Sequence, residues 1–277
     1  MSSGPAPISI DLNPDPVRVR VLAALSCPRL GFTDQMFIAT QLVKMNIELR
    51  KHSGAFWEQS LSQLLYQAVD EDFDFVLTLD YDTIFRPTDV WYMLNLMVNE
   101  PKASAIFPVQ YRREADQLLL GVREHKDGTI QANSLADHLV PATVGHFGCT
   151  FIRVADLKRM PHPWLHSKPG PTGKWDDGRV DADVAFWNNL RACGFKMFCA
   201  TRCVVGHLQQ MITWPGEGYL PVHQYSGKYF KDGDAPPIVI QSASYRATNG
   251  VDHAASEIHS KPSDHGSQDG DSGRGEV

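Results

Sequence analysis

The sequence predicts an α/β protein with a mostly parallel central sheet and helices on both faces. Strand-like and helix-like segments alternate from Val17 to Val109, and such alternation is typical of parallel strands joined by helical crossovers. The segment from Phe75 to Asp80 is almost continuously apolar, as expected of a strand that helices cover on both faces. Together these two observations favour a layered α/β sheet.

In the first half of the chain, each predicted element follows from its residue pattern. Apolar residues recur every three or four positions between Trp57 and Ala68, which predicts an amphipathic helix whose large apolar side chains, Trp57 included, face the core. The other elements are predicted from apolar runs, caps and helix breakers: a strand at Val17–Ser26, a helix from Thr33 or Asp34, a strand within Ile47–Gly54, a strand ending at Asp80, a helix capped by Thr88 and closed by Pro101, and a strand from Ala103 to Val109.

The second half predicts a smaller and partly antiparallel portion. Its predicted elements are a hairpin at Leu118–Gln131, a strand within Thr143–Val154, a lid-like loop at Leu165–Gly178, a helix from Asp181 to Cys193, and short strands that end near His207. We expect an N-terminal extension (1–16), one domain (17–235, with halves 17–110 and 111–235), and a disordered Ser/Gly-rich tail (241–277).

Composition excludes several classes of protein. With 277 residues, 43% of them hydrophobic, the chain can bury a sizeable core. Its formal net charge of -6 argues against a general affinity for nucleic acid or anionic membranes. Five cysteines without a paired CxxC motif favour reduced thiols. We expect a cytoplasmic protein, because no targeting segment and no membrane-length apolar run is evident in the sequence.

Two carboxylates, Asp80 and Asp82, follow the buried strand. In parallel sheets, ligands bind beyond the carboxyl ends of the strands. Paired carboxylates at such an end can hold Mg²⁺ or Mn²⁺, which commonly bridges a protein carboxylate to substrate phosphates. A short motif of this kind also occurs by chance as a polar strand terminus.

Four segments carry a resemblance to a known family. The segments "LDYDTIF", "GHFGCTFIRV", "DADVAFWNNLRACGFK" and "VVGHL", in this order, resemble glycosyltransferases of the GT-A fold, and most of all the small family-2-type enzymes of bacterial and bacteriophage genomes. The likeness covers roughly residues 17–210. It implies a Rossmann-like α/β fold with a mostly parallel central sheet flanked by helices and a smaller antiparallel portion on the acceptor side.

The resemblance implies a role for each matching residue. Asp82 would ligate the metal, and Asp80 would face the ribose and diphosphate. His207 would complete the metal coordination, although a lone histidine is more often a structural residue. Ser26, at the end of the first strand, would contact the nucleoside, and Asp183 would be the general base.

The acidic pair at the predicted base position departs from the family pattern. The family commonly has Glu-Asp there, whereas this chain has Ala182-Asp183 with Asp181 one step earlier. On a helix, Asp181 and Asp183 would lie about 200° apart, so we expect at most one of them to face the site. We favour Asp183 as the base and Asp181 as the helix N-cap.

The resulting hypothesis is a metal-dependent, inverting transfer of a sugar to an acceptor hydroxyl. The oxygen and imidazole ligands favour Mn²⁺ over Mg²⁺, and the family likeness favours a UDP-sugar donor. The acceptor would be a glycan, a protein or a small molecule; net negative charge argues against a modified nucleic-acid base. If the protein is viral, the expected compartment is the host cytoplasm.

Three alternatives stay open. The fold and acids also suit a sugar-phosphate nucleotidyltransferase, although no Gly-rich basic loop follows the first strand. A non-catalytic relative could bind a nucleotide-sugar or glycan. Cys199, Cys203 and His207 are spaced by four, which would suit zinc on a helix, but a strand would separate them by roughly 13 Å.

The basic segment "YRREADQ" at Tyr111 is interpreted as a solvated face.

Overall fold

The computed structural model describes residues 8–10, 17–27, 38–114, 118–119, 138–176 and 178–239. These residues separate into two compact units. The larger contains the described residues up to Met211 together with Tyr225–Lys228, and the smaller contains Ile212–Gln224 and the described residues from Tyr229 onward. The division falls inside the range 17–235 that the sequence analysis assigns to one domain; those domain limits stay a prediction.

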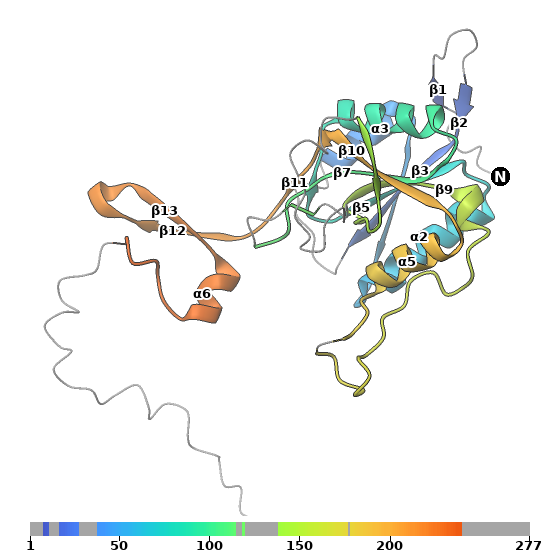
Figure 1. Ribbon diagram of the computed structural model, residues 1–277. Helices are drawn as coiled ribbons and strands as arrows, with labels where there is room; N and C mark the ends of the chain where they lie inside the picture. The colour runs from blue at the N-terminus through green and yellow to red at the C-terminus, as the bar shows by residue number, and fades with distance from the viewer. Residues whose placement is uncertain are drawn as a thin grey trace, which may run out of the picture. The chain divides into compact units, whose positions relative to one another are not determined.

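A seven-stranded mixed sheet forms the centre of the larger unit (Figure 1). Strand order is β4-β3-β5-β9-β7-β10-β8. Adjacent pairs β4/β3, β3/β5 and β7/β10 are parallel, whereas β9 is antiparallel to both β5 and β7, and β8 is antiparallel to β10. Five of the strands therefore run the same way. Their bounds are β3 (Val21–Cys27), β4 (Glu48–Ser53), β5 (Phe75–Asp80), β7 (Ala103–Val109) and β10 (Lys196–Val204), with β8 (Leu139–Ala142) and β9 (Cys149–Arg153) opposed.

Helices cover both faces of this sheet, which confirms the predicted fold class. Figure 1 shows α3 (Pro87–Asn99) on one face and α2 (Trp57–Asp70) with α5 (Ala182–Ala192) on the other. Two buried apolar clusters correspond to these faces. Alternate residues of β5 divide between them, because side chains on a strand point to opposite faces: Leu77 joins the α3 side and Val76 the α2 side. The remaining elements of this unit are η1 (Gln41–Met45), α4 (Val154–Leu157), β6 (Thr83–Ile84) and β11 (Gly206–His207).

Some predicted boundaries were wrong. The first strand is interrupted at Arg20, which separates β2 (Val17–Val19) from β3, and β2 pairs instead with β1 (Ile8–Ile10). Helix α3 is capped at Arg86 and begins with Pro87, so Thr88 is not its cap. The fixed φ of proline suits the first helical position, where its missing N–H has no intrahelical partner to lose.

Other predictions lie outside the described residues. They are the helix start at Thr33 or Asp34, most of the hairpin at Leu118–Gln131, and the tail from residue 241. Among the residues that the structure does describe, no helix is both long and apolar enough to cross a bilayer.

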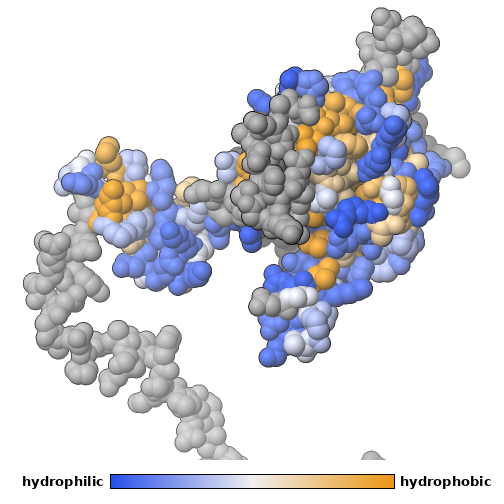
Figure 2. Space-filling view, in the orientation of Figure 1, coloured by the Kyte–Doolittle hydropathy of each residue, from blue (hydrophilic) through white to orange (hydrophobic). Residues whose placement is uncertain are grey.

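The smaller unit is organised around a two-stranded hairpin. Strands β12 (Met211–Pro215) and β13 (Pro221–Tyr225) pair, with η3 (Glu217–Tyr219) between them, and the end of α6 (Ser226–Asp232), from Tyr229 on, belongs to the same unit. The indole Nε1 of Trp214 donates a 2.9 Å hydrogen bond to Gln224, and its ring packs against Tyr229. Figure 2 shows apolar surface on this unit, where Leu220 is exposed.

A buried histidine holds the loop that leads into β9. The Nε2 atom of His146 lies 2.8 Å from the carbonyl oxygen of Pro108, and its Nδ1 accepts a 3.2 Å hydrogen bond from the backbone N–H of Gly148. These contacts fit a neutral ring that carries its proton on Nε2. Burial lowers the pKa of His146 to about 4.

Acid should therefore destabilise the protein through His146. Between pH about 6.5 and about 4, His146 binds a proton in the unfolded chain but not in the folded one. Its contribution to the free energy of unfolding is therefore fully present above this window. That contribution is lost as the pH falls through the window, by about 3 kcal/mol in all. His146→Asn keeps an acceptor for Gly148 but does not titrate, so urea unfolding across this window should show a shallower loss than the wild type. His138→Asn, at an exposed position, is the control. An unchanged slope in His146→Asn would contradict this role.

Candidate functional site

The carboxyl edge of the parallel strands carries most of the predicted site residues. Asp80 is the last residue of β5, and Ser26 is its partner in the parallel register with β3. Because β9 runs the other way, its start lies at this edge too, and the N–H of Asp80 donates a 3.3 Å hydrogen bond to the carbonyl of Gly148. The hydroxyl of Ser26 is buried and has no hydrogen-bond partner among the described residues.

Asp82 and His207 meet although they are far apart in sequence. Strand β6 pairs antiparallel with β11, so His207 lies opposite Thr83, and the N–H of Leu208 donates a 2.7 Å hydrogen bond to the carbonyl of Asp82. The pairing brings His207 Nε2 to 3.1 Å from Asp82 Oδ2. A Cβ at Gly206 would lie 3.3 Å from the Cβ of Ile84, so glycine permits the close approach of the two short strands.

The environment of His207 shows which of its ring nitrogens faces Asp82. His207 Nδ1 lies 3.0 Å from the carbonyl oxygen of Tyr111, and this carbonyl can only accept, so Nδ1 carries a proton. In the neutral ring, Nε2 would then present a lone pair to a carboxylate oxygen. Burial alone lowers the pKa of His207, but the hydrogen bonds to Asp82 and Tyr111 outweigh it and raise the pKa above its ordinary value.

Asp82 and His207 could supply part of the coordination sphere of a divalent metal. Asp82 offers a buried carboxylate, of which Oδ1 has no hydrogen-bond partner among the described residues, and His207 offers an imidazole nitrogen. No group of three or more His, Cys, Asp or Glu side chains in the described part of the chain is arranged to hold a metal. An ion at Asp82 and His207 would therefore take its remaining ligands from phosphate oxygens or water.

Arg113 is a site residue that the sequence analysis missed. Its Nη2 atom forms an ion pair with Oδ2 of Asp82, and its guanidinium lies 5.6 Å from the centre of the Tyr81 ring. We interpreted its basic segment as a solvated face; Arg113 is half exposed, as that predicts, but it also forms this ion pair with a buried carboxylate. The signal was positional, because the segment directly follows β7, whose carboxyl end lies at the same edge as that of β5.

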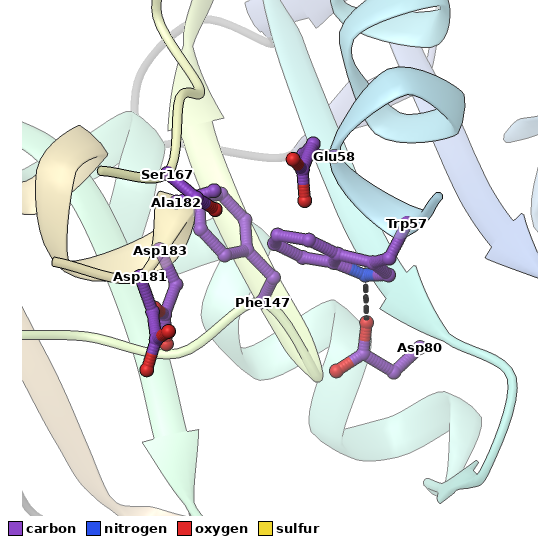
Figure 3. Close-up of a pocket in the computed structure, with 8 residues that line it drawn as sticks. All are labelled: Trp57, Glu58, Asp80, Phe147, Ser167, Asp181, Ala182 and Asp183. Carbon is purple, nitrogen blue, oxygen red and sulfur yellow. Dashed lines mark hydrogen bonds between the residues drawn. The ribbon is translucent and has the colours of Figure 1, made fainter. Parts of the chain in front are cut away.

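A cavity of about 380 Å³ lies beside Asp80 (Figure 3). Trp57 and Phe147 lie edge to face within it, with ring centroids 5.3 Å apart. Asp80 lies on one side of this aromatic pair, and Asp181 and Asp183 lie on the other. The full lining is Trp57, Glu58, Asp80, Phe147, Ser167, Asp181, Ala182 and Asp183, which includes four carboxylates.

Asp80 is held by the indole of Trp57. The Nε1–H of Trp57 donates a 3.0 Å hydrogen bond to Asp80 Oδ1. Burial raises the pKa of Asp80 to about 6, and the charge of Asp82 adds to this rise, whereas the hydrogen bond from Trp57 opposes it. We predicted Trp57 as a core residue of its helix, and it is partly buried, but it also lines the cavity. Its position as the first residue of a crossover helix was the available signal, because such helices begin at the carboxyl edge of the sheet.

Both acids near the start of α5 line the cavity, which corrects the expectation that only one could face it. Asp181 is the N-cap, as predicted, but its backbone is extended (φ -72°, ψ 155°) and its side chain makes no capping hydrogen bond. The angular spacing of a helix therefore does not apply to it. Asp181 pairs with Arg179 at 3.1 Å. Burial raises the pKa of Asp183, although the N–H of Val184 donates to its carboxylate and opposes the rise.

The described residues do not support the zinc alternative. Cys199 and Cys203 lie on β10, not on a helix, and an irregularity between Ala200 and Val204 turns them to opposite faces of the sheet. All five cysteines are free, as expected from the sequence.

Removing the indole donor should destabilise the site. Trp57→Phe keeps an aromatic ring but leaves the buried carboxylate of Asp80 without this hydrogen bond, so we expect a loss of about 1–3 kcal/mol in the free energy of unfolding. Trp91→Phe, at another partly buried tryptophan, is the control. In an Asp80→Asn background, Trp57→Phe should lower the free energy of unfolding by less, because a buried neutral amide loses less than a buried carboxylate when the indole donor is removed. Equal losses in both backgrounds would refute the coupling.

Comparisons with known proteins bear on the fold alone. No family model and no curated protein matches the sequence. Among solved structures, the chain is similar to A197 from STIV, with a TM-score of 0.50 and 14% identity over 81% of this chain and 99% of that one. It also resembles GalNAc-T7, solved with UDP, GalNAc and Mn²⁺, with a TM-score of 0.40 and 9% identity over 69% of this chain and 44% of that one. The first likeness indicates a shared fold, and the second is too distant to support a conclusion about this chain.

Proposed function

We propose that this protein is a metal-dependent glycosyltransferase that moves a sugar from a nucleotide-sugar to an acceptor hydroxyl. One observation carries the proposal: Asp80 and Asp183, from distant parts of the chain, line opposite sides of one aromatic cavity. Asp82 follows Asp80 by two residues, and the charges of both Asp82 and His207 affect the pKa of Asp80. Neither Asp82 nor His207 lines the cavity itself. This arrangement supplies a candidate diphosphate side and a candidate base side.

On the donor side, Ser26 and Asp80 would contact the nucleoside and the diphosphate. Asp82 and His207 would hold a divalent cation, whose chemistry is Lewis-acid neutralisation of the departing diphosphate. The mixed oxygen and nitrogen donor set favours Mn²⁺, and UDP is the first nucleotide to test. The carboxylates of Asp80 and Asp82 would repel a diphosphate. A diphosphate would therefore bind here only with a cation between it and these carboxylates.

On the acceptor side, Asp183 would be the general base. It would accept the proton of the acceptor hydroxyl as the oxygen bonds to the anomeric carbon, while the electrons of the sugar–phosphate bond leave with the diphosphate. A base across the cavity from the diphosphate favours inversion of configuration. The faces and edges of Trp57 and Phe147 offer apolar contact for a sugar ring.

Binding of the nucleotide should depend on metal and on Asp82. We expect calorimetry to show UDP binding in the presence of Mn²⁺ that falls at least tenfold when the metal is removed or Asp82 is changed to Asn, because one metal ligand is worth more than about 1.4 kcal/mol. Asp74→Asn, at a carboxylate outside the site, is the control. Metal-independent binding of equal strength in Asp82→Asn would contradict the donor site.

Turnover should depend on Asp183 and on pH. Asp183→Asn should lose about 10²–10⁴-fold in kcat with little change in nucleotide affinity, because it removes only the proton acceptor. The base works when deprotonated and its pKa is raised, so wild-type kcat should fall with acidity at a pH above the ordinary range for aspartate. If Asp181→Asn lost turnover and Asp183→Asn did not, the base would be Asp181 instead.

A further inference from the structure

We propose that Arg113 takes the place of the site's cation on Asp82 when no metal is bound, so that the guanidinium and a divalent metal compete for the same carboxylate oxygen. The inference rests on the proposed metal site. It adds a residue of this chain that sets how tightly that site binds metal.

The burial of Asp82 makes a counter-charge necessary. Its side chain is 1% exposed, and an ionised carboxylate this deep is costly unless it is paired. Two groups contact its Oδ2 atom, the guanidinium of Arg113 and the imidazole of His207. Arg113 carries a permanent charge, whereas His207 does not, so Arg113 is the reliable partner of this carboxylate.

The geometry brings the two cations into competition. The Asp82 oxygen nearest to His207 is Oδ2, 3.1 Å from Nε2, so a metal held between these two atoms would share Oδ2 with the Arg113 Nη2 atom that contacts it. A divalent ion and a guanidinium at one oxygen also repel each other. On this proposal, a metal that binds at Oδ2 displaces the Arg113 side chain.

Arg113 is placed to leave at small cost. Its side chain is 49% exposed, so its guanidinium can be hydrated when the ion pair breaks, while Asp82 gains the metal in exchange. It lies in a turn after β7 with Glu114, whose backbone N–H is held by the side chain of Gln209 through a 2.7 Å hydrogen bond. The backbone next to Arg113 is thus anchored, and only the side chain needs to move.

The competition predicts that removing Arg113 strengthens metal binding. In metal-free protein, titration of Mn²⁺ followed by electron paramagnetic resonance should give about tenfold tighter binding for Arg113→Gln than for the wild type, since a hydrogen bond to a charged group is worth about that factor. Arg113→Lys, which keeps a charge, should fall between them. The neighbouring exposed Arg112→Gln has the same change in net charge and should match the wild type.

Thermal unfolding provides a second readout that does not depend on activity. Without metal, Arg113→Gln should have a lower Tm than the wild type and Arg112→Gln, because Asp82 loses its counter-ion. Saturating Mn²⁺ should raise the Tm of Arg113→Gln more than that of either of the others, since the metal replaces the missing charge. A purely structural role for Arg113 would instead weaken metal binding together with stability.

Equal or weaker Mn²⁺ affinity in Arg113→Gln than in the wild type would overturn the proposal, and so would the absence of Mn²⁺ binding from every variant. Failure of the proposed function would look different. In that case Arg113→Gln would bind Mn²⁺ more tightly, with binding lost in Asp82→Asn, yet no nucleotide-sugar would be consumed by the wild type.

Discussion

The site depends on one electrostatic constraint, the burial of the Asp82 carboxylate. A charge at 1% exposure is stable in the folded chain only if another group compensates it. The backbone pairing of β6 with β11 brings His207 to it, and the segment after β7 brings Arg113. The Asp82 carboxylate thus links three parts of the chain: β6, β11 and the segment after β7. Removing its charge would weaken the contacts that His207 and Arg113 make with it.

The sheet explains why these residues can meet. Parallel strands joined by crossover helices bring their carboxyl ends and the first turns of those helices to a common edge. Asp80 ends β5, Trp57 begins α2 and Asp183 lies in the first turn of α5. The antiparallel strand β9, inserted between β5 and β7, adds Phe147 and Gly148 to this edge from the opposite direction. A cavity with acids on two sides and an aromatic pair between them follows from this topology.

Part of this arrangement could be predicted from the sequence. The apolar run before Asp80 and the periodicity after Trp57 predicted β5 and α2, because burial on two faces or on one stripe leaves a clear pattern. The antiparallel direction of β9 could not be read from its residues, since a buried strand is equally apolar in either direction. Arg113 was missed because a solvated arginine and one paired with a buried carboxylate look the same in sequence. Asp181 was misjudged because helical geometry was applied to a residue whose backbone is extended.

The proposed activity breaks the bond between a sugar and a nucleoside diphosphate. The most direct measurement is phosphorus NMR of the nucleotide products after incubation of the full chain with UDP-sugars, Mn²⁺ and a panel of hydroxyl acceptors, with and without pyrophosphate. Release of UDP, dependent on acceptor and on Asp183, is the predicted result. Formation of UTP and a sugar phosphate only when pyrophosphate is present would contradict it, and would identify nucleotidyl transfer in place of glycosyl transfer.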